Sequence, residues 1–394
     1  MSEKTSRAYG SSSDTLPDER PLASDLTRAT AFSYASAERL RAVGAGEASG
    51  DFYPRYGHPA ARRFEAAMAR LEGADGAVSF ASGMAALFAI FGGFLGRGDV
   101  VAVSRQVYGG VDAVLAHELP RFGVEVRRFD AFDEDDTTRA LSGPVRLVHV
   151  ETPTNPLCRV VDLARIREHA DACGALLSVD ATFLPPPLQR PLAHGADLVM
   201  HSATKIIGGH SDALGGVVSG RHELMEVLEG FRCRTGAMLG PDTAWLFLRS
   251  LETLNLRARR SSDNARRLAE FLDGLRRRGT RISEVHYPGL PDHPDHDRAR
   301  RYMETGGFVV TFGVEGALTD AVRVFDRFRM IARAVSLGGA HTVASLPLHT
   351  SHGGMSAEER RRAGIGDTLI RVSVGVEPVE DIEQDILAAL GPER

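Results

Sequence analysis

Short apolar runs alternate with amphipathic segments along most of the chain from about residue 60 onward. Runs rich in β-branched residues, typical of strands buried on both faces of a parallel sheet, cover residues 99–104, 145–150, 176–179 and 198–200. Segments with helical periodicity lie between them, for example at 62–72 and 162–173. Strands that alternate with helices in this way predict an α/β fold.

The pattern changes after about residue 255. A long Arg-rich helix is expected at 255–278, followed by strands at 307–314 and 369–374 and helices at 319–328 and 379–390. Residues before about 55 have few periodic apolar positions, and the first twenty or so are polar enough to be mobile. We therefore expect an N-terminal arm (1–55), a large domain (56–255) and a smaller C-terminal domain (256–394).

Composition narrows the class of protein. A chain of 394 residues with 43% hydrophobic and 25% charged residues suits a soluble protein with a large core. A formal charge of −5 disfavours nucleic acid and anionic membranes as partners. Three widely spaced cysteines indicate a reducing, cytoplasmic compartment and no metal site. The apolar stretch 77–96 is expected to be a buried helix packed on the sheet and not a membrane span.

Lysine usage points to a specific chemistry. Of the 47 basic residues only Lys4 and Lys205 are lysines, and Lys4 lies in the polar tail. Arginine can replace lysine for surface charge, but its guanidinium stays protonated and cannot condense with a carbonyl. Lys205 is therefore a candidate to hold an aldehyde cofactor as a Schiff base.

Two groups of residues near strand ends have the character of a phosphate site. Ser82, Gly83 and Met84 stand where a helix begins, so small residues there let backbone N–H groups approach an anion. Ser202 and Thr204 flank Lys205 and place hydroxyl groups beside its amine. The alternatives are an ordinary helix start and two hydroxyls that cap backbone groups in a turn.

Four further positions carry candidate chemistry. Asp180 ends a buried run, where its carboxylate needs either a protonated pyridine nitrogen or a structural arginine. Tyr108 precedes two glycines and either stacks on a flat ring or is a turn aromatic. Arg371 interrupts an apolar strand and requires a carboxylate, from a substrate or from the fold. Tyr53 and Arg55, in the arm, are suitable phosphate ligands.

Together these residues resemble the Cys/Met-metabolism family of pyridoxal-phosphate enzymes, whose members include methionine γ-lyases, cystathionine lyases and synthases, and O-acetylhomoserine sulfhydrylases. The resemblance covers nearly the whole chain from about residue 25. It implies a fold-type I transferase fold, with a mostly parallel sheet in the large domain and a smaller C-terminal α+β domain. The matching segments are 178–183, 201–205, 208–212, 151–156, 287–291 and 336–339.

The resemblance also implies a role for each site residue. Lys205 would bind the aldehyde of pyridoxal 5′-phosphate, Asp180 would pair with its ring nitrogen, and Tyr108 would stack on the ring and assist proton transfer. Asn155 would lie near the phenolic oxygen, and Ser336 and Arg371 would bind the substrate carboxylate. The family is usually a homotetramer of two site-sharing dimers. The implied phosphate ligands are Ser82, Gly83, Met84, Ser202 and Thr204, with Tyr53 and Arg55 from a neighbouring subunit.

Several positions depart from the family pattern or bear on substrate choice. Phe52, Ala113 and Val335 are apolar where cystathionine γ-lyases tend to be charged, which favours a short uncharged thioether. We therefore expect a carbon–sulfur lyase that converts methionine to 2-oxobutanoate, ammonia and methanethiol. The alternatives are γ-replacement of the cystathionine γ-synthase or O-acylhomoserine sulfhydrylase type, a cystathionine γ-lyase and, last, an inactive protein. The departures that weaken a strict methionine γ-lyase assignment, or whose effect is open, are His58, Gly110, Ala181 and Cys233.

Overall fold

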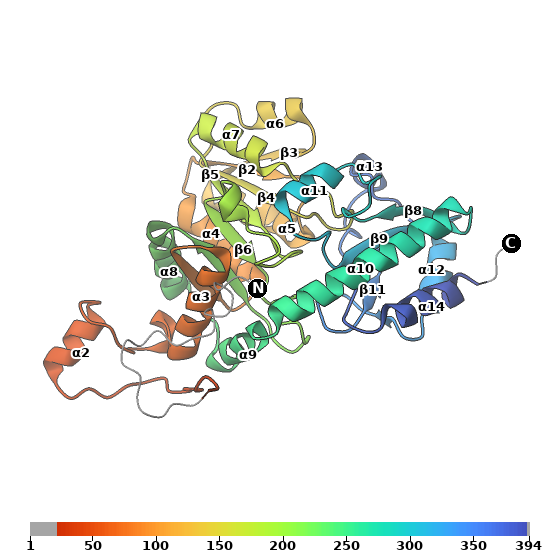
Figure 1. Cartoon of the computed structure of the whole chain (residues 1–394). Helices are drawn as coiled ribbons and strands as arrows, with labels where there is room; N and C mark the ends of the chain where they lie inside the picture. The colour runs from red at the N-terminus through yellow and green to blue at the C-terminus, as the bar shows by residue number, and fades with distance from the viewer. Residues whose placement is uncertain (1–21, 392–394) are drawn as a thin grey trace.

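A seven-stranded sheet forms the centre of the larger part of the molecule in the computed structural model, which describes residues 22–391 (Figure 1). The strand order is β1-β7-β6-β5-β4-β2-β3. The pairs from β6 to β3 are parallel, and β7 pairs antiparallel with both β6 and β1. The predicted α/β class and mostly parallel sheet are therefore confirmed. The strands are β1 (Gly76–Phe80), β2 (Val100–Ser104), β3 (Glu125–Phe129), β4 (Leu147–Glu151), β5 (Leu176–Asp180), β6 (Leu198–His201) and β7 (Gly216–Gly220).

Helices cover both faces of this sheet because successive side chains of each strand point to opposite faces. On one face the core includes α3 and α9, where the rings of Phe64 and Phe247 stack with centroids 5.2 Å apart. On the other face α4 and α8 pack through residues such as Phe91 and Leu228. The helices of this part are α3 (Pro59–Glu72), α4 (Gly83–Phe94), α5 (Gly109–His117), α6 (Glu134–Ala140), α7 (Leu163–Cys173), α8 (His222–Thr235) and α9 (Pro241–Leu251).

A second, five-stranded sheet with the order β10-β11-β12-β9-β8 has a separate core. The long helix α10 (Leu254–Arg277) extends from beside the first sheet along the second (Figure 1), and the predicted boundary at 255/256 falls at its start. The other elements are β8 (Ile282–His286), α11 (His296–Tyr302), β9 (Val309–Val314), α12 (Leu318–Asp326), β10 (Ala332–Arg333), β11 (Val343–Ser345), α13 (Ala357–Arg362), β12 (Leu369–Ser373) and α14 (Val379–Leu390).

The N-terminal arm extends away from both sheets (Figure 1). Its helix α2 (Ala37–Gly44) buries only Val43. The start of the arm is tied to α9, where the Trp245 indole N–H donates to the Ser24 carbonyl over 2.7 Å and Arg28 pairs with Asp242. The tail that the sequence predicts to be mobile, which includes Lys4, lies outside the described residues apart from its last positions.

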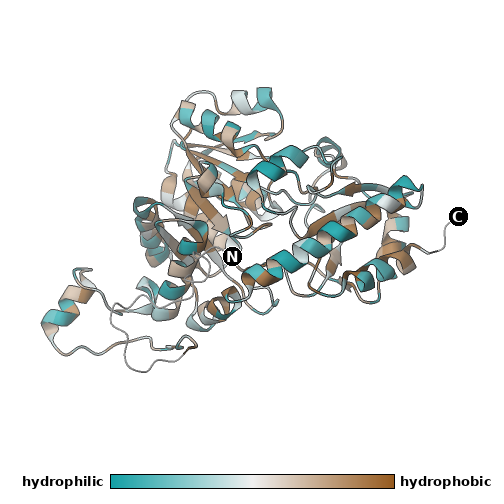
Figure 2. Cartoon of the chain, viewed as in Figure 1, coloured by the Kyte–Doolittle hydropathy of each residue, from teal (hydrophilic) through white to brown (hydrophobic). Residues whose placement is uncertain are grey.

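The apolar segment 77–96 corrects one expectation. Its first residues belong to strand β1, and only the part from Gly83 onward is the predicted buried helix, α4. Ser82 separates the two elements because its extended backbone and side-chain oxygen cap α4 through the Ala85 N–H. Apolar residues concentrate in the strands (Figure 2). Among the helices within residues 22–391, none combines the length and apolar character that a bilayer crossing requires.

Candidate active site

Three parallel strands of the large sheet deliver polar residues to one edge. β4 ends at Glu151 and β5 ends at Asp180, and the register places these two residues directly opposite each other. β6 ends at His201, and the turn after it carries Ser202, Thr204 and Lys205. The carboxyl-terminal edge of a parallel sheet is the usual ligand-binding edge of an open α/β fold.

Lys205 lies half-buried at this edge and its amine reaches the smaller part of the molecule. Nζ donates a hydrogen bond of 2.8 Å to Oγ of Ser336. Burial lowers the pKa of Lys205, the positive charge of Arg371 lowers it further, and Asp180 opposes the shift. A lowered pKa makes the neutral, nucleophilic amine more accessible near pH 7.

The segment 336–339 is shaped to reach Lys205. Ser336 adopts φ 82°, a left-handed conformation that is rare for residues other than glycine. Gly338 has φ 76°, and a Cβ there would lie 2.5 Å from the backbone nitrogen of Ile206. Glycine is therefore required for this close contact with the Lys205 turn.

Arg371, on β12, is buried with 5% of its surface exposed. Its Nη1 donates to Oδ1 of Asn155 over 2.9 Å, and its Nη2 donates to the carbonyl of Ser336 over 3.0 Å. Nε has no partner, and within residues 22–391 no carboxylate forms an ion pair with this guanidinium. Burial lowers the pKa of Arg371 to about 10. The expected alternative, an acid of the fold, is thus not found, and the buried cation is available to an anionic ligand.

Asp180 is buried without an arginine partner among the described residues. Its Oδ1 accepts the Thr182 N–H over 2.9 Å, and the Thr182 hydroxyl accepts the Ser202 N–H over 2.8 Å. Burial raises the pKa of Asp180, whereas hydrogen bonds from Thr182 and the charges of His201 and Lys205 oppose the rise. A protonated ring nitrogen would satisfy this carboxylate as an ion pair.

The predicted phosphate ligands outside the arm lie close together, and one of them has its hydroxyl engaged by the backbone. A Cβ on Gly83 would lie 2.8 Å from Cβ and 2.9 Å from Oγ of Ser202, so the start of α4 and the Lys205 turn are in contact. Ser82 caps the N–H of Ala85, which leaves the N–H groups of Gly83 and Met84 without intrahelical acceptors at the helix end. The hydroxyl of Thr204 is instead engaged with the backbone of Gly215.

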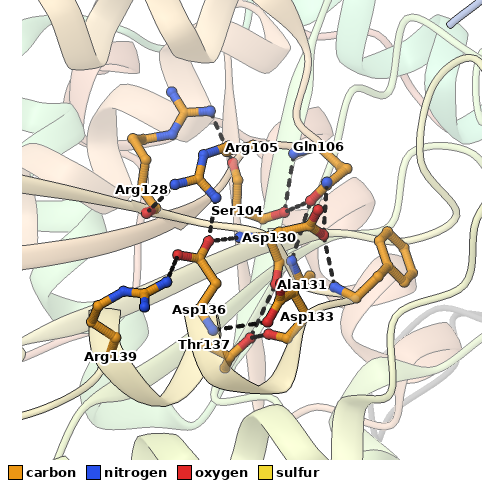
Figure 3. A network of polar contacts seen from close by, with 11 residues as sticks. Ser104, Arg105, Gln106, Arg128, Asp130, Ala131, Asp133, Asp136, Thr137 and Arg139 are labelled. Atoms are coloured by element: carbon orange, nitrogen blue, oxygen red, sulfur yellow. Dashed lines mark hydrogen bonds and ion pairs between the residues drawn. The ribbon is translucent and has the colours of Figure 1, made fainter. Parts of the chain in front are cut away.

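Tyr108 begins α5 with 49% of its surface exposed. Its ring lies against Gly110, where an added Cβ would be 2.6 Å from the Tyr108 ring and 2.9 Å from Sδ of Met84. A polar network holds the preceding turn (Figure 3): Gln106 Nε2 donates to Asp130 Oδ1 over 3.0 Å, and Ser104 Oγ donates to Gln106 Oε1 over 2.8 Å. The tyrosine is therefore presented by a fixed turn and is open to a ligand.

The arm residues are not part of this group within one chain. Arg55 donates to the Cys233 carbonyl over 2.8 Å and stacks on the Tyr56 ring. Tyr53 and Arg55 line a separate cavity of about 300 Å³ between the arm and the start of α9. No polar contact within residues 22–391 joins either residue to Lys205 or Asp180. Phe52, also in the arm, contacts Tyr56 edge-on.

The remaining predicted positions lie at the surface or have structural roles. Ala113 and Val335 are exposed, and Ala181 is buried in the core. His58 caps α3 through the Ala61 N–H, and its Nε2 contacts the Leu239 carbonyl at 2.8 Å. This imidazole provides the capping acceptor that a shorter polar side chain would supply at an N-cap.

Two residues at the site were not predicted to act there. Glu151, which begins the family-matching segment 151–156, accepts the backbone N–H groups of both Tyr108 and Asn155. His352, in the segment before α13, is buried beside Arg371 and hydrogen-bonds the backbone of Asn155. The position of Glu151 at the start of the matching segment 151–156 could have identified it as a site residue. Nothing in the sequence around His352 links His352 to the site.

The assembled residues fit a phosphorylated pyridine aldehyde. They offer an amine with a lowered pKa, a helix end beside Ser202 for an anion, a buried carboxylate for a ring nitrogen and an exposed aromatic ring for stacking. A buried arginine remains for a second anion. Among the described residues, no cluster of His, Cys, Asp or Glu is arranged to hold a metal ion.

Comparisons with known proteins agree with this chemistry. The family model of Cys/Met metabolism PLP-dependent enzymes matches residues 8–391. An O-succinylhomoserine sulfhydrylase of Pseudomonas aeruginosa is 43% identical over 93% of this chain and 90% of its own length. An L-methionine gamma-lyase of Pseudomonas putida is 38% identical over 91% of this chain and 90% of its own length. The crystal structure of cystathionine gamma synthase from Xanthomonas oryzae pv. oryzae superposes with a TM-score of 0.91 at 34% identity, covering 99% of this chain and 98% of that chain.

Proposed function

The chain belongs to the family of Cys/Met metabolism PLP-dependent enzymes, and on that premise we propose that it catalyses γ-elimination from a short, uncharged thioether amino acid, with methionine as the first candidate. The fold is that of the fold-type I PLP enzymes, and pyridoxal 5′-phosphate is the cofactor. The family acts on sulfur amino acids by γ-elimination or γ-replacement. The proposal concerns which of these reactions this chain performs.

The observation that carries the proposal is that, in the part of the chain that the structure describes, the arginines around the Tyr108 segment already have acidic partners. Ala113 and Val335 are apolar and exposed. The arginines of the neighbouring turn and strand are already paired, Arg105 with Asp136 and Arg128 with Asp112. A substrate whose distal end carries a carboxylate would find no free positive partner here, whereas a methyl thioether needs none.

Each residue of the site has a separate role in the proposed reaction. Arg371, supported by Asn155 and Ser336, binds the substrate α-carboxylate through Nη1 and Nη2. The carboxylate of Asp180 keeps the ring nitrogen protonated, and the bound cofactor then supplies an electron sink for the carbanion at Cα. With the cofactor bound, Lys205 Nζ would take the proton from Cα, would then take a proton from Cβ so that the Cγ–S bond can break, and would return a proton to Cγ. Tyr108 donates a proton to the departing sulfur.

Product analysis tests the proposal. Purified holoenzyme given methionine alone is expected to release 2-oxobutanoate, ammonia and methanethiol in equal amounts. Turnover that requires an activated homoserine ester and an added thiol, with no 2-oxo acid formed from methionine or cystathionine, contradicts it. A protein that binds the cofactor but leaves every such substrate unchanged would support the inactive alternative.

The second candidate is γ-replacement on O-succinylhomoserine, and two observations favour it. The sulfhydrylase of Pseudomonas aeruginosa is 43% identical to this chain, against 38% for the Pseudomonas putida lyase. Gly110 stands where methionine γ-lyases often carry cysteine, and a Cβ there would lie 2.6 Å from the Tyr108 ring. O-succinylhomoserine with sulfide, assayed beside methionine, separates the two reactions because only replacement gives homocysteine.

We further propose that the arm serves a second copy of the chain, within a tetramer of two site-sharing dimers. Among the described residues, the polar and ring contacts of Arg55 are with Tyr53, Tyr56 and Cys233 of α8, and the arm extends from the body (Figure 1). Mixing two inactive variants, Arg55→Ala and Lys205→Ala, tests this. Shared sites restore roughly one quarter of wild-type activity, because half of the randomly formed dimers contain one intact site of two. No recovery would indicate that each chain completes its own site.

A further inference from the structure

We propose that Glu151 is a positioning residue, whose carboxylate sets the places of Tyr108 and Asn155 relative to each other. The inference rests on the cofactor site and not on which amino acid is the substrate. Glu151 closes strand β4 and has 3% of its surface exposed. Its two oxygens are bonded to the backbone of Tyr108 and Asn155, and it acts through these two residues.

Both oxygens of the Glu151 carboxylate are engaged by the site. Oε2 accepts the Tyr108 N–H over 2.8 Å, and Oε1 accepts the Asn155 N–H over 3.2 Å. Tyr108 and Asn155 lie in different turns, at the ends of different strands. The Glu151 carboxylate therefore fixes the distance between Tyr108, which is proposed to stack on the ring, and Asn155, which is bonded to Arg371.

Gln106 and Glu151 both hold the Tyr108 turn through hydrogen bonds, and the contact with Glu151 is nearer the site. Gln106 ties the start of the turn to the β3–α6 loop through Asp130 (Figure 3). That contact holds the start of the turn and does not reach Tyr108, two residues later at the start of α5. The hydrogen bond from the Tyr108 N–H to Glu151 holds the end of the turn and joins it to β4.

Asn155 is held on three sides, and Glu151 supplies one of them. Its side chain accepts from Arg371, its backbone contacts His352, and its N–H is bound by Glu151. A shift of Asn155 therefore moves the support of the Arg371 guanidinium. Through this contact Glu151 influences the geometry at which a substrate carboxylate binds, as well as the place of the ring.

The placement of an acid here has an energetic cost that indicates a function. Burial and the adjacent Asp180 both raise the pKa of Glu151 well above its usual range, and the two backbone hydrogen bonds oppose that rise. An apolar or amide side chain would avoid this cost. Only a carboxyl group of this length offers two acceptor oxygens to two N–H groups at once.

Glu151→Gln and Glu151→Asp test the inference through the affinity of the protein for pyridoxal phosphate. The amide keeps the shape but has only one acceptor, and the aspartate keeps two acceptors but is one methylene shorter. Each is expected to weaken pyridoxal phosphate affinity about tenfold, measured by equilibrium dialysis of the apoenzyme, because one buried hydrogen bond is lost. Asp197→Asn is the matched control: this largely buried carboxylate accepts Arg167, Arg221 and the Leu177 N–H near the amino-terminal ends of β5 and β6, at the opposite edge of the sheet from the site. It should lower the unfolding midpoint and leave cofactor affinity unchanged.

A double-mutant cycle separates positioning from general stabilisation. If Glu151 acts by placing the Tyr108 ring, the tenfold effect of Glu151→Gln should shrink to about threefold or less in a Tyr108→Ala background. A tenfold effect in both backgrounds, or unchanged affinity in Glu151→Gln and Glu151→Asp, overturns the inference. Because affinity is measured without substrate, failure of the methionine assay leaves this test intact.

Discussion

Lys205 Nζ and Ser336 Oγ lie 2.8 Å apart although 131 residues separate them in the chain. Lys205 follows a strand of the large sheet, whereas Ser336 precedes β11 of the second sheet. Ser336 also accepts Arg371 through its carbonyl. Ser336 thus joins the amine proposed to perform the chemistry to the guanidinium proposed to recognise the substrate, and both sheets contribute to the candidate site.

Replacing Lys205 by arginine should abolish catalysis while preserving charge and fold. A guanidinium at this position cannot condense with the cofactor aldehyde or accept the Cα proton near neutral pH. We expect turnover to fall by at least about a thousandfold and the visible absorbance of bound cofactor to change, with the unfolding midpoint close to wild type. Lys4→Arg, outside the described residues, is the control and should change neither property. Residual turnover above a few per cent in Lys205→Arg would contradict the assignment.

Ser336→Ala tests the contact with Lys205 directly. The substitution removes Oγ but keeps the carbonyl that binds Arg371, so recognition of the substrate carboxylate should weaken less than amine positioning. We expect kcat to fall about tenfold, in line with the loss of one hydrogen bond to a charged group, with a smaller change in KM. Ser345→Ala is the matched control, since this buried hydroxyl on β11 has no hydrogen-bond partner. Equal effects of the two variants would argue against the role of Ser336.

Local sequence patterns predict many of the helices and strands, and the elements that they miss were missed for physical reasons. Helix α14 coincides with its predicted range because the periodicity of its apolar residues and the residue types at its two ends indicate the same bounds. Strand β1 was hidden inside a continuous apolar stretch, where periodicity cannot separate a buried strand from a buried helix. The two-residue strand β10 and the edge strand β8 lack a long apolar run, so their pairing depends on tertiary contacts.

The family motifs predicted more residues of the candidate site than the chemistry of single residue types did. Lys205, Asp180 and Arg371 combine an unusual residue type with a buried strand or strand end, which is readable in a sequence. Glu151 shares that signal, but its function lies in backbone hydrogen bonds from Tyr108 and Asn155 that only the fold creates. The engagement of the Thr204 hydroxyl by Gly215 was equally hidden, because it depends on a turn eleven residues later.

Gly83→Ala should weaken cofactor binding through a steric conflict. The new Cβ would lie 2.8 Å from Cβ of Ser202, so either the start of α4 or the Lys205 turn has to shift. Phosphate binding at a helix end depends on the position of its first N–H groups. We expect at least a tenfold rise in the dissociation constant of pyridoxal phosphate, roughly the loss of one charge-assisted hydrogen bond. Gly240→Ala, at the start of α9 with no atom within 4 Å of the new Cβ, should have no effect.

Acid should destabilise the protein through its buried histidines. Burial lowers the pKa of His149 to about 3 and the pKa values of His293 and His352 to about 4. The unfolded chain binds these protons near pH 6.5, so between that value and the folded pKa the unfolded state holds more protons and stability falls as pH falls. At pH 5 each histidine costs up to about 2 kcal/mol of unfolding free energy relative to pH 7.

His149→Gln isolates one of these contributions. His149 lies inside β4 and contacts the Ser178 hydroxyl at 3.1 Å, so the variant lowers stability at every pH. Its loss of unfolding free energy between pH 7 and pH 5 should nevertheless be smaller than that of the wild type by about 1–2 kcal/mol. Urea unfolding at both pH values measures this difference. Parallel curves for the two proteins would show that His149 does not titrate differently in the folded and unfolded states.

Arg371→Lys should separate substrate recognition from cofactor binding. The guanidinium binds Asn155 and Ser336 while leaving Nε free, a geometry suited to a planar carboxylate, and an ammonium group cannot reproduce the two parallel donors. We expect kcat/KM for the amino acid to fall about a hundredfold or more, mainly through KM, since loss of a charged hydrogen-bonded contact costs roughly 2–4 kcal/mol.

A buried structural arginine provides the control for this change. Arg232, 2% exposed, donates to Glu65 and to the Ser79 carbonyl, and no polar contact among the described residues joins it to Lys205 or Arg371. Arg232→Lys should lower the unfolding midpoint and leave KM within about twofold of wild type, because its partners belong to the fold. If Arg371→Lys lowered stability in the same way but left KM unchanged, the buried cation would be a structural element and the substrate carboxylate would have to bind elsewhere.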